Sequence, residues 1–301
     1  MLDWVIEPLR LTFMHRALML GILLGILCAI VGSYMIVQQM GMLAHAISHS
    51  VMAGLPIAYV VGVALSFGAL VAGVLSALVL YLIESRSRVK TDAAMALILT
   101  SFVAIGVTLV SVIPGANRID LLHVLFGNIL GVTMTEVWWS LAITVFGIAL
   151  VRLFYKELLF YTFDPKGAQA SGLPVHWYNA SLIVAMTVTI VVCLPTVGAL
   201  LVVALLVAPA VTAYLLVKEL HQMMWVGSVI GALSSVIGMY LSYYLDAPSG
   251  AAIVLVSFCF FCLAFIFSPS DGLLSGLWAQ RKRAKFVSHE QALEGDRKTL
   301  F

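Results

Sequence analysis

Residues 17–38 read ALMLGILLGILCAIVGSYMIVQ and contain no acidic or basic side chain. About 20 consecutive apolar residues are enough for a helix to cross a bilayer core, so this segment is long enough for one crossing. The uncharged region extends further, because no Asp, Glu, Lys or Arg occurs between Arg16 and Glu84. So long a stretch without charge is typical of a protein inside a membrane and excludes an ordinary soluble domain.

The rest of the chain repeats this pattern. Of the 301 residues of the whole chain, 62% are hydrophobic and 10% are charged, and the mean hydropathy is +1.10. In a soluble domain about 25% of the residues are charged. The apolar runs are continuous and do not alternate, which excludes a membrane β-barrel. We therefore predict an all-α, polytopic membrane protein with about eight transmembrane helices plus short re-entrant or external helices. The predicted crossings are 17–38, 66–83, 93–113, 136–155, 177–194, 198–217, 222–245 and 250–268.

Positive charge marks the loops that we predict to be cytoplasmic, because cytoplasmic loops are enriched in Lys and Arg. These residues gather in 84–92, in 156–176, in 218–222 and in the polar tail 279–301. With both termini also in the cytoplasm, the number of crossings between these segments must be even. Two apolar pieces are then left over. We expect 42–63 to enter the membrane and return, or to be a broken helix, and 119–133 to be a short external or re-entrant helix.

Polar side chains inside an apolar run are costly and are therefore candidates for function. His45 and His49 are four residues apart in such a run, a spacing that places two imidazoles on one face of a helix. Neutral imidazole binds late first-row divalent metal ions and brings no net charge into the bilayer. The spacing favours contact with a metal ion. The alternative is a pair of buried histidines that hydrogen-bond to neighbouring helices.

Three further polar residues are candidates for an external access route or a docking contact. Asp120 and His123 lie in the predicted external piece 119–133, and Asp246 follows a tyrosine-rich helix end. An amphipathic piece normally has a polar face, and an Asp at a helix end can serve as a cap. These ordinary interpretations stay open at this point.

The cytoplasmic segment 163–174 predicts a short helix. Asp164 and Pro165 form a helix start, because Asp caps free amide groups and proline fits the first turn. Gly172 followed by Pro174 forms a helix stop. The resulting helix, about 164–172, has Ala168 in its middle. A small, alanine-rich helix between two crossings is poorly suited to catalysis but well suited to docking against a partner.

At these residues the sequence resembles the metal-permease family of ABC transporters, over nearly all of residues 1–278. Three motifs carry the resemblance: HAISHSVMAG at 45–54, FDPKGAQASG at 163–172 and YLSYYLDAPSG at 240–250. Members import manganese, zinc or iron, and the manganese branch is the most similar. Many members have Asp where this chain has His45. This departure leaves the role of His49 intact but bears on ion preference, because two imidazoles favour zinc, iron or another late metal over manganese.

The resemblance implies a multi-pass permease of the bacterial inner membrane, with no tightly bound cofactor and no nucleic-acid partner. It implies a homodimer that docks on a cytoplasmic ABC ATPase dimer and receives a divalent metal ion from an extracytoplasmic metal-binding protein. Residues 164–172 would be the coupling helix against the ATPase, with contacts from Phe163, Asp164, Pro165, Ala168 and Gly172. Residues 1–278 would form the permease domain and 279–301 a cytoplasmic polar tail.

Other classes of protein fit the sequence less well. The chain has no G-x-x-x-x-G-K-[ST] loop, so ATP hydrolysis would belong to a partner chain and this subunit would not be an enzyme. A secondary carrier would need ionisable residues in its crossings for ion coupling and would have no use for segment 163–174. An intramembrane zinc protease would need a glutamate between the two histidines, where this chain has Ala46, Ile47 and Ser48. A scaffold without transport activity would have no use for paired histidines at depth.

Overall fold

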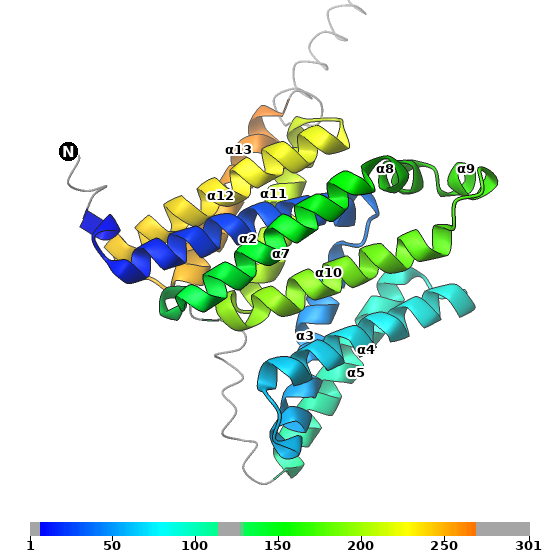
Figure 1. Cartoon of the computed structure of the whole chain (residues 1–301), viewed down its shortest axis with the longest axis horizontal. Coiled ribbons are helices and arrows are strands. Elements are labelled where there is room, and N and C mark those ends of the chain that lie inside the picture. The colour runs from blue at the N-terminus through cyan, green and yellow to red at the C-terminus, as the bar shows by residue number, and fades with distance from the viewer. Residues whose placement is uncertain (1–6, 114–126, 128, 269–301) are drawn as a thin grey trace, which may run out of the picture.

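Nine helices in the described part of the chain are long and apolar enough to cross a bilayer, and all eight predicted crossings are among them. The computed structural model describes residues 7–113, 127 and 129–268 (Figure 1), and every regular element in these residues is a helix. The predicted tail 279–301 and most of 119–133 lie outside them. The crossing helices are α2 (Thr12–Val37), α3 (Gly41–Val61), α4 (Leu65–Arg86), α5 (Thr91–Val112), α7 (Met134–Leu153), α10 (Val175–Val197), α11 (Ala199–Leu216), α12 (Leu220–Leu245) and α13 (Ser249–Phe267). The shorter elements are η2 (Ile129–Gly131), α8 (Tyr155–Phe163) and α9 (Pro165–Ala170).

The segment that we expected to be re-entrant or broken is one continuous helix. α3 runs without interruption from Gly41 to Val61, with Pro56 inside it. Its hydropathy is the lowest of the nine crossing helices, because it contains two histidines and two serines. The prediction for 42–63 is therefore wrong. These polar side chains reduce the apolar signal of the segment without interrupting its backbone hydrogen bonds.

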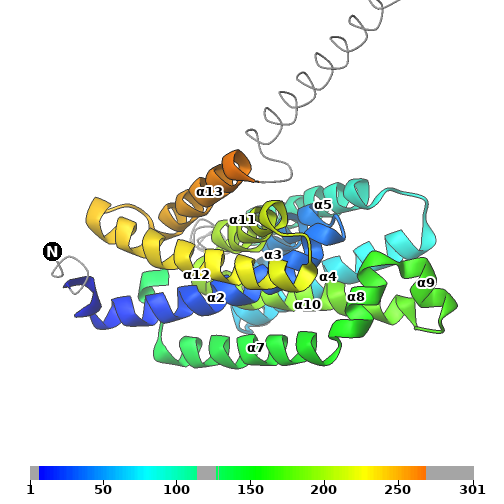
Figure 2. The same cartoon turned by 90° about the horizontal axis from the view of Figure 1, so that it is seen from above.

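An odd number of crossing helices places the start of α2 and the end of α13 at opposite ends of the bundle. Figures 1 and 2 both show the start of α2 at one end and α8 and α9 at the other. Glu7 lies close enough to Tyr244, near the end of α12, to interact with it electrostatically. Ser268, which follows α13, instead donates a hydrogen bond of 2.6 Å to the Leu215 carbonyl near the end of α11. The prediction that both termini share one side of the membrane therefore finds no support.

Small residues allow α2 and α12 to pack closely as antiparallel helices. A methyl group on Gly25 would lie 2.7 Å from the backbone of Gly231, and one on Gly21 would lie 3.0 Å from Ser235 Cβ. Ala29 faces Gly227 one turn further along. Contacts repeated at every fourth residue are the usual way in which membrane helices approach closely. This pairing brings α2 into the centre of the bundle, where α11 also packs on it.

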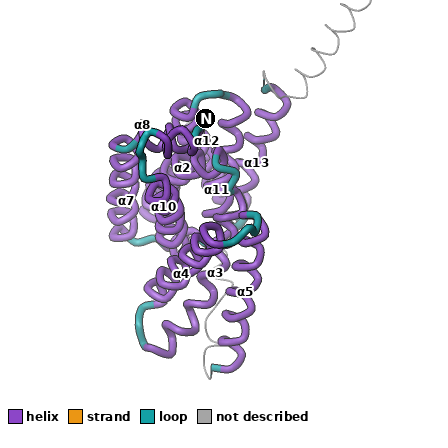
Figure 3. Tube along the Cα trace, turned by 90° about the vertical axis from the view of Figure 1, so that its right-hand side faces the viewer, coloured by secondary structure: helices purple, strands orange, loops and turns teal. Residues whose placement is uncertain are grey.

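The helix α3 is held between α4 and α5, in the part of the molecule that Figure 3 shows below the other helices. A methyl group on Gly54 would collide with the backbone carbonyl oxygen of Gly68 in α4. One on Gly106 of α5 would lie 2.8 Å from the backbone of Met52. Backbone contacts from two sides fix the rotation of α3 about its axis, and so they determine which of its side chains remain accessible.

Candidate functional site

The two histidines of α3 lie against each other. The ring centroids of His45 and His49 are 4.5 Å apart, with an angle of 68° between the ring planes. Both side chains are half-buried, whereas the residues on the other faces of this turn, Ala46, Ile47 and Ser48, are buried. The prediction that the i, i+4 spacing places both imidazoles on one face of a helix is confirmed. This face is the accessible one.

Two methionines extend the same face. Met42 lies three residues before His45 and is 49% exposed, and Met52 lies three residues after His49 and is half-buried. At 100° per residue these four side chains fall within less than one quarter of the helix circumference, an angular spread of about 80°. A thioether is a soft and weak ligand for metal ions. The sequence analysis missed the methionines, although their i−3 and i+3 spacing from the histidines was the signal that identifies them.

Within the described residues, neither imidazole has a hydrogen-bond partner, and no third His, Cys, Asp or Glu joins the pair to form a metal-binding cluster. The alternative interpretation requires each histidine to hydrogen-bond to a neighbouring helix. No such hydrogen bond is present in this part of the chain. Two nitrogen donors on a solvent-accessible face can bind a divalent ion weakly. Three or four donors are needed for a tight structural site.

The predicted short helix at 164–172 is confirmed as α9. The Asp164 carboxylate accepts a hydrogen bond of 2.8 Å from the Gly167 amide, and Pro165 occupies the first turn. The helix ends at Ala170, and Gly172, two residues later, turns the chain with a φ of +88° that is accessible to glycine but strained for other residues. The Leu173 amide then donates to the Ala168 carbonyl, which satisfies the end of the helix.

The structure separates the predicted docking residues into two groups. Phe163, Asp164, Pro165 and Gly172 are exposed, so they are available to a partner. Ala168 is 0% exposed, so its methyl group packs inside the chain and helps to hold α9 in place. The role of Ala168 in coupling to an ATPase stays a prediction, and its burial shows that its methyl group faces the rest of the chain.

Aromatic packing holds α8 against α10. The rings of Tyr161 and Tyr178 stack with centroids 6.4 Å apart. Burial, followed by the nearby Glu84 carboxylate, raises the pKa of the Tyr161 hydroxyl above its ordinary value, so it stays protonated at physiological pH. These contacts place the end of α4 at the same end of the bundle as α8.

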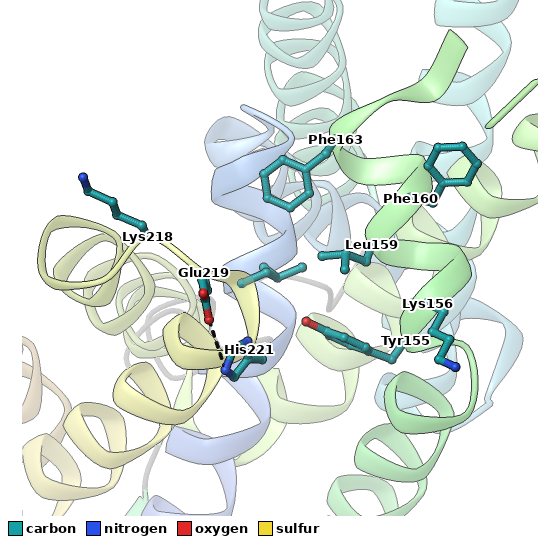
Figure 4. Close-up of a pocket in the computed structure, with 9 residues that line it drawn as sticks. Tyr155, Lys156, Leu159, Phe160, Phe163, Lys218, Glu219 and His221 are labelled. Atoms are coloured by element: carbon teal, nitrogen blue, oxygen red, sulfur yellow. Dashed lines mark ion pairs between the residues drawn. The ribbon is translucent and has the colours of Figure 1, made fainter. Parts of the chain in front are cut away.

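A pocket opens between α8 and the turn that leads into α12 (Figure 4). It has a volume of about 580 Å³, with Tyr155, Phe160 and Phe163 on one side. On the other side Glu219 forms an ion pair of 3.3 Å with His221. Phe160 is 41% and Phe163 60% exposed. Exposed aromatic side chains beside a short capped helix are typical of a surface that contacts another protein.

The predicted external residues are described only in part. Asp246 is exposed and follows α12 in the left-handed conformation, with φ of +48°. It lies at the end of the bundle opposite α9. Asp120 and His123, the other two predicted external residues, lie outside the described residues.

In the described residues, nine crossing helices, an accessible imidazole pair on one of them and a short capped helix at one end define a polytopic helical membrane protein. The chain belongs to the ABC 3 transport family, whose sequence model matches residues 10–268.

Individual relatives cover most of the chain. It is 41% identical to the manganese transport system membrane protein MntC of Halalkalibacterium halodurans, over 94% of this chain and 96% of the relative. It is 36% identical to a probable iron transport system membrane protein of Haemophilus influenzae, over 89% of this chain and 98% of the relative. A chain in the solved structure of PsaBC from Streptococcus pneumoniae in complex with Fab superposes with a TM-score of 0.78 at 34% identity, covering 89% of this chain and 96% of that one.

Proposed function

We propose that this chain is the membrane-spanning subunit of an ABC importer that moves a divalent transition-metal ion, with manganese as the first candidate. The imidazole pair of His45 and His49 on the accessible face of α3 carries the proposal. Relatives named as manganese transport proteins support this ion. Zinc and iron are the alternatives, because both donors are nitrogen and another relative is named as an iron transport protein.

A second copy of the chain would complete the ion site. One chain supplies two imidazoles, so two chains whose α3 faces meet would supply four nitrogen donors. A site of this kind has enough ligands to remove water from a divalent ion. If the two α3 helices separate during transport, each half keeps only two donors, and the ion is released.

Charge placement supports a cytoplasmic position for α8 and α9. The basic residues near this end of the bundle include Arg86, Arg88, Lys90, Lys156, Lys166 and Lys218, whereas only Arg10 and Arg16 occur near the start of α2 among the described residues. Since cytoplasmic loops are enriched in Lys and Arg, the α9 end would face the cytoplasm and the start of α2 would face outward. An ATPase dimer would then contact α9 and the exposed rings of Phe160 and Phe163 beside it. An extracytoplasmic metal-binding protein would deliver the ion at the opposite end of the bundle.

The test is metal-stimulated ATP hydrolysis by this chain reconstituted in lipid with its ATPase. The binding protein is supplied loaded with manganese, zinc or iron in turn. We expect one metal to stimulate hydrolysis in the wild type, and we expect His45→Ala and His49→Ala to remove the stimulation while the complex stays assembled. Met19→Ala, at an exposed apolar position of α2, is the control variant and keeps the stimulation.

Two results would contradict the proposal. Full stimulation in both histidine variants would exclude the imidazole pair as the ion site. Metal uptake driven by a proton gradient, with no ATPase bound to the chain, would place the protein among secondary carriers.

A further inference from the structure

A second and larger cavity lies between three helices that are far apart in the sequence. It has a volume of about 750 Å³ and borders α2, α7 and α12, with the start of α8 at its mouth. Figure 2 shows α2 lying between α12 on one side and α7 on the other. Ile26 and Ile30 of α2 therefore form the floor of this groove, and the other two helices form its walls.

The groove has the depth of one leaflet of a bilayer. On α12 its lining runs from His221 to Ala232, an interval that corresponds to about 16 Å along a helix axis. One leaflet contributes about 15 Å of hydrocarbon to the bilayer core. Beyond His221, which lies at the mouth and pairs with Glu219, the α12 side chains along this depth are apolar apart from Ser228. The Ser228 hydroxyl donates to the Met224 carbonyl within the same helix. A lipid acyl chain matches both the length and the chemistry of this surface.

The groove faces the lipid side of the bundle. α7 is the least buried of the nine crossing helices, and it packs mainly against α2. Along the edges of the groove Leu153 is 71%, Trp225 74% and Val229 53% exposed. Tryptophan is enriched where a membrane protein passes from the hydrocarbon to the headgroup region. Trp225 therefore marks the mouth of the groove as the level of the lipid headgroups.

The mouth of the groove carries charged side chains that form no ion pair with other described residues. Arg152 and Lys156 both line it, and neither forms an ion pair with a carboxylate in the described residues. Glu157 lines it too, and its Oε2 atom is shielded from solvent without a hydrogen-bond partner in that same part of the chain. A ligand that satisfies all three groups must carry an anionic group and, close to it, a hydrogen-bond donor for the half-buried Glu157 carboxylate. A cationic donor suits a carboxylate best, because it adds an ion pair to the hydrogen bond.

We propose that this groove binds a phospholipid with a primary-amine headgroup, of the phosphatidylethanolamine type, from the leaflet at the α8 and α9 end. The phosphate binds Arg152 and Lys156, the ammonium group donates to Glu157, and an acyl chain lies on Ile26, Ile30 and the walls of the groove. Basic pockets between transmembrane helices are a general mode of headgroup binding. The carboxylate of Glu157 favours an amine-bearing lipid over a purely anionic one. The inference does not depend on which ion the protein transports.

The test is native mass spectrometry of the full chain, purified in detergent and titrated with lipids that have identical acyl chains. The three lipids are phosphatidylethanolamine, phosphatidylcholine and phosphatidylglycerol. We expect phosphatidylethanolamine to bind tightest, because the choline headgroup has no N–H to donate and phosphatidylglycerol has no cation for Glu157. Soluble phosphoethanolamine, which carries the same two charges without acyl chains, should not displace the bound lipid.

Variants assign the binding to the groove. The double variant Arg152→Gln, Lys156→Gln should bind phosphatidylethanolamine about thirtyfold more weakly, because each basic residue contributes about 1 kcal/mol. Lys166→Gln, which removes one positive charge from α9 outside the groove, is the control and should bind as the wild type does. Glu157→Gln should abolish the preference over phosphatidylcholine. Ala232→Trp should block the deep end of the groove and weaken all three lipids, with the thermal unfolding midpoint confirming that each variant is folded.

Several outcomes would overturn the proposal. Wild-type binding by the double variant would place the lipid elsewhere, and tighter binding of phosphatidylglycerol would make the site one for anionic lipids. Displacement by soluble phosphoethanolamine would make it a site for a small soluble ligand. A photocrosslinker at Val229 that captures a polypeptide in native membranes, and no lipid, would make it a protein interface.

Discussion

The consecutive helices α2 and α3 are buried to a similar degree but differ in what they leave accessible. In the apolar 18-residue segment of each helix, 67% of the α2 residues and 61% of the α3 residues are buried. Beyond Arg16, the accessible residues of α2, such as Met19, Leu23 and Ile30, are apolar. Those of α3 include His45 and His49 on one face. Burial alone therefore does not distinguish a helix that holds the bundle together from one that binds a ligand, whereas the chemistry of the accessible face does.

Both helices use glycine to approach a neighbour, but with different results. In α2 the glycines Gly21 and Gly25 face α12 along one continuous contact, which makes α2 a central support. In α3, Gly54 meets α4 while Gly106 of α5 meets Met52 from another side. Contacts on two sides leave one face of α3 free, and that face carries the imidazoles.

The largest expected effect comes from removing an imidazole from α3. His49→Leu should reduce metal uptake into cells to background, because only one nitrogen donor per chain remains. The thermal unfolding midpoint should hardly change, since His49 is half-buried and has no hydrogen-bond partner in the described residues. His45→Asp should retain uptake and shift the preference towards manganese, because a carboxylate suits this ion better than an imidazole does. Unaltered uptake by His49→Leu would show that the accessible face of α3 is not the ion path.

The next largest effect concerns the central contact of α2. Gly25→Leu should lower the free energy of unfolding by about 1–3 kcal/mol or more, because the new side chain meets the backbone of Gly231. The measurement is the thermal unfolding midpoint in detergent. Gly41→Leu, at the start of α3, is the matched control, because an added methyl group there meets nothing within 4 Å. Equal midpoints for the two variants would disprove the supporting role of the contact between α2 and α12.

A smaller effect is expected at α9. Asp164→Ala removes the side chain that accepts from the Gly167 amide, and the loss of such a cap costs about 1 kcal/mol. Since α9 has only six residues, we expect local loosening, seen as faster amide hydrogen exchange in 165–170, together with weaker binding of the ATPase. Lys166→Ala keeps the cap and should leave exchange unchanged. Protected amides in Asp164→Ala would show that packing of Ala168 is sufficient to hold the helix.

The smallest effect concerns one accessible methionine on each helix, the half-buried Met52 of α3 and the exposed Met19 of α2. Met52→Leu conserves volume, so its cost in stability should stay below about 1.5 kcal/mol. If the thioether contacts the passing ion, the ratio of zinc to manganese uptake should change several-fold in competition experiments. Met19→Leu makes the same change on α2 and should leave the ratio alone. A ratio that moves equally in both variants would remove Met52 from the ion path.

Much of the architecture was predictable because membrane crossings leave a local signal. A helix in lipid must be long and apolar, so the uncharged runs identified eight of the nine crossings. The start and stop of α9 were predictable for a similar reason, since Asp164, Pro165 and Gly172 act on backbone groups within a few residues of themselves. The i, i+4 spacing of His45 and His49 likewise fixed their shared face once the segment was helical.

Other features depend on contacts that no local pattern reveals. The continuity of α3 was missed because two histidines, two serines and Pro56 make the segment resemble a re-entrant piece, whereas packing of Gly54 and Gly106 against its backbone neighbours holds it as one helix. The side on which α2 begins depends on that missed crossing. The groove between α2, α7 and α12 could not be predicted, because it combines residues such as Ile26, Arg152 and Trp225 from distant parts of the sequence.

Pro56 makes α3 easier to bend at one turn than elsewhere along its length. A proline has no amide hydrogen, so the carbonyl of Met52, four residues earlier, lacks the donor that every other interior turn of the helix supplies. Gly106 of α5 lies against that carbonyl, where the absence of a side chain permits backbone contact. Bending α3 at this turn breaks one hydrogen bond fewer than bending it anywhere else. The helix therefore contains a joint one turn beyond its imidazoles, about which the half that carries His45 and His49 can tilt while the far half stays packed on α4.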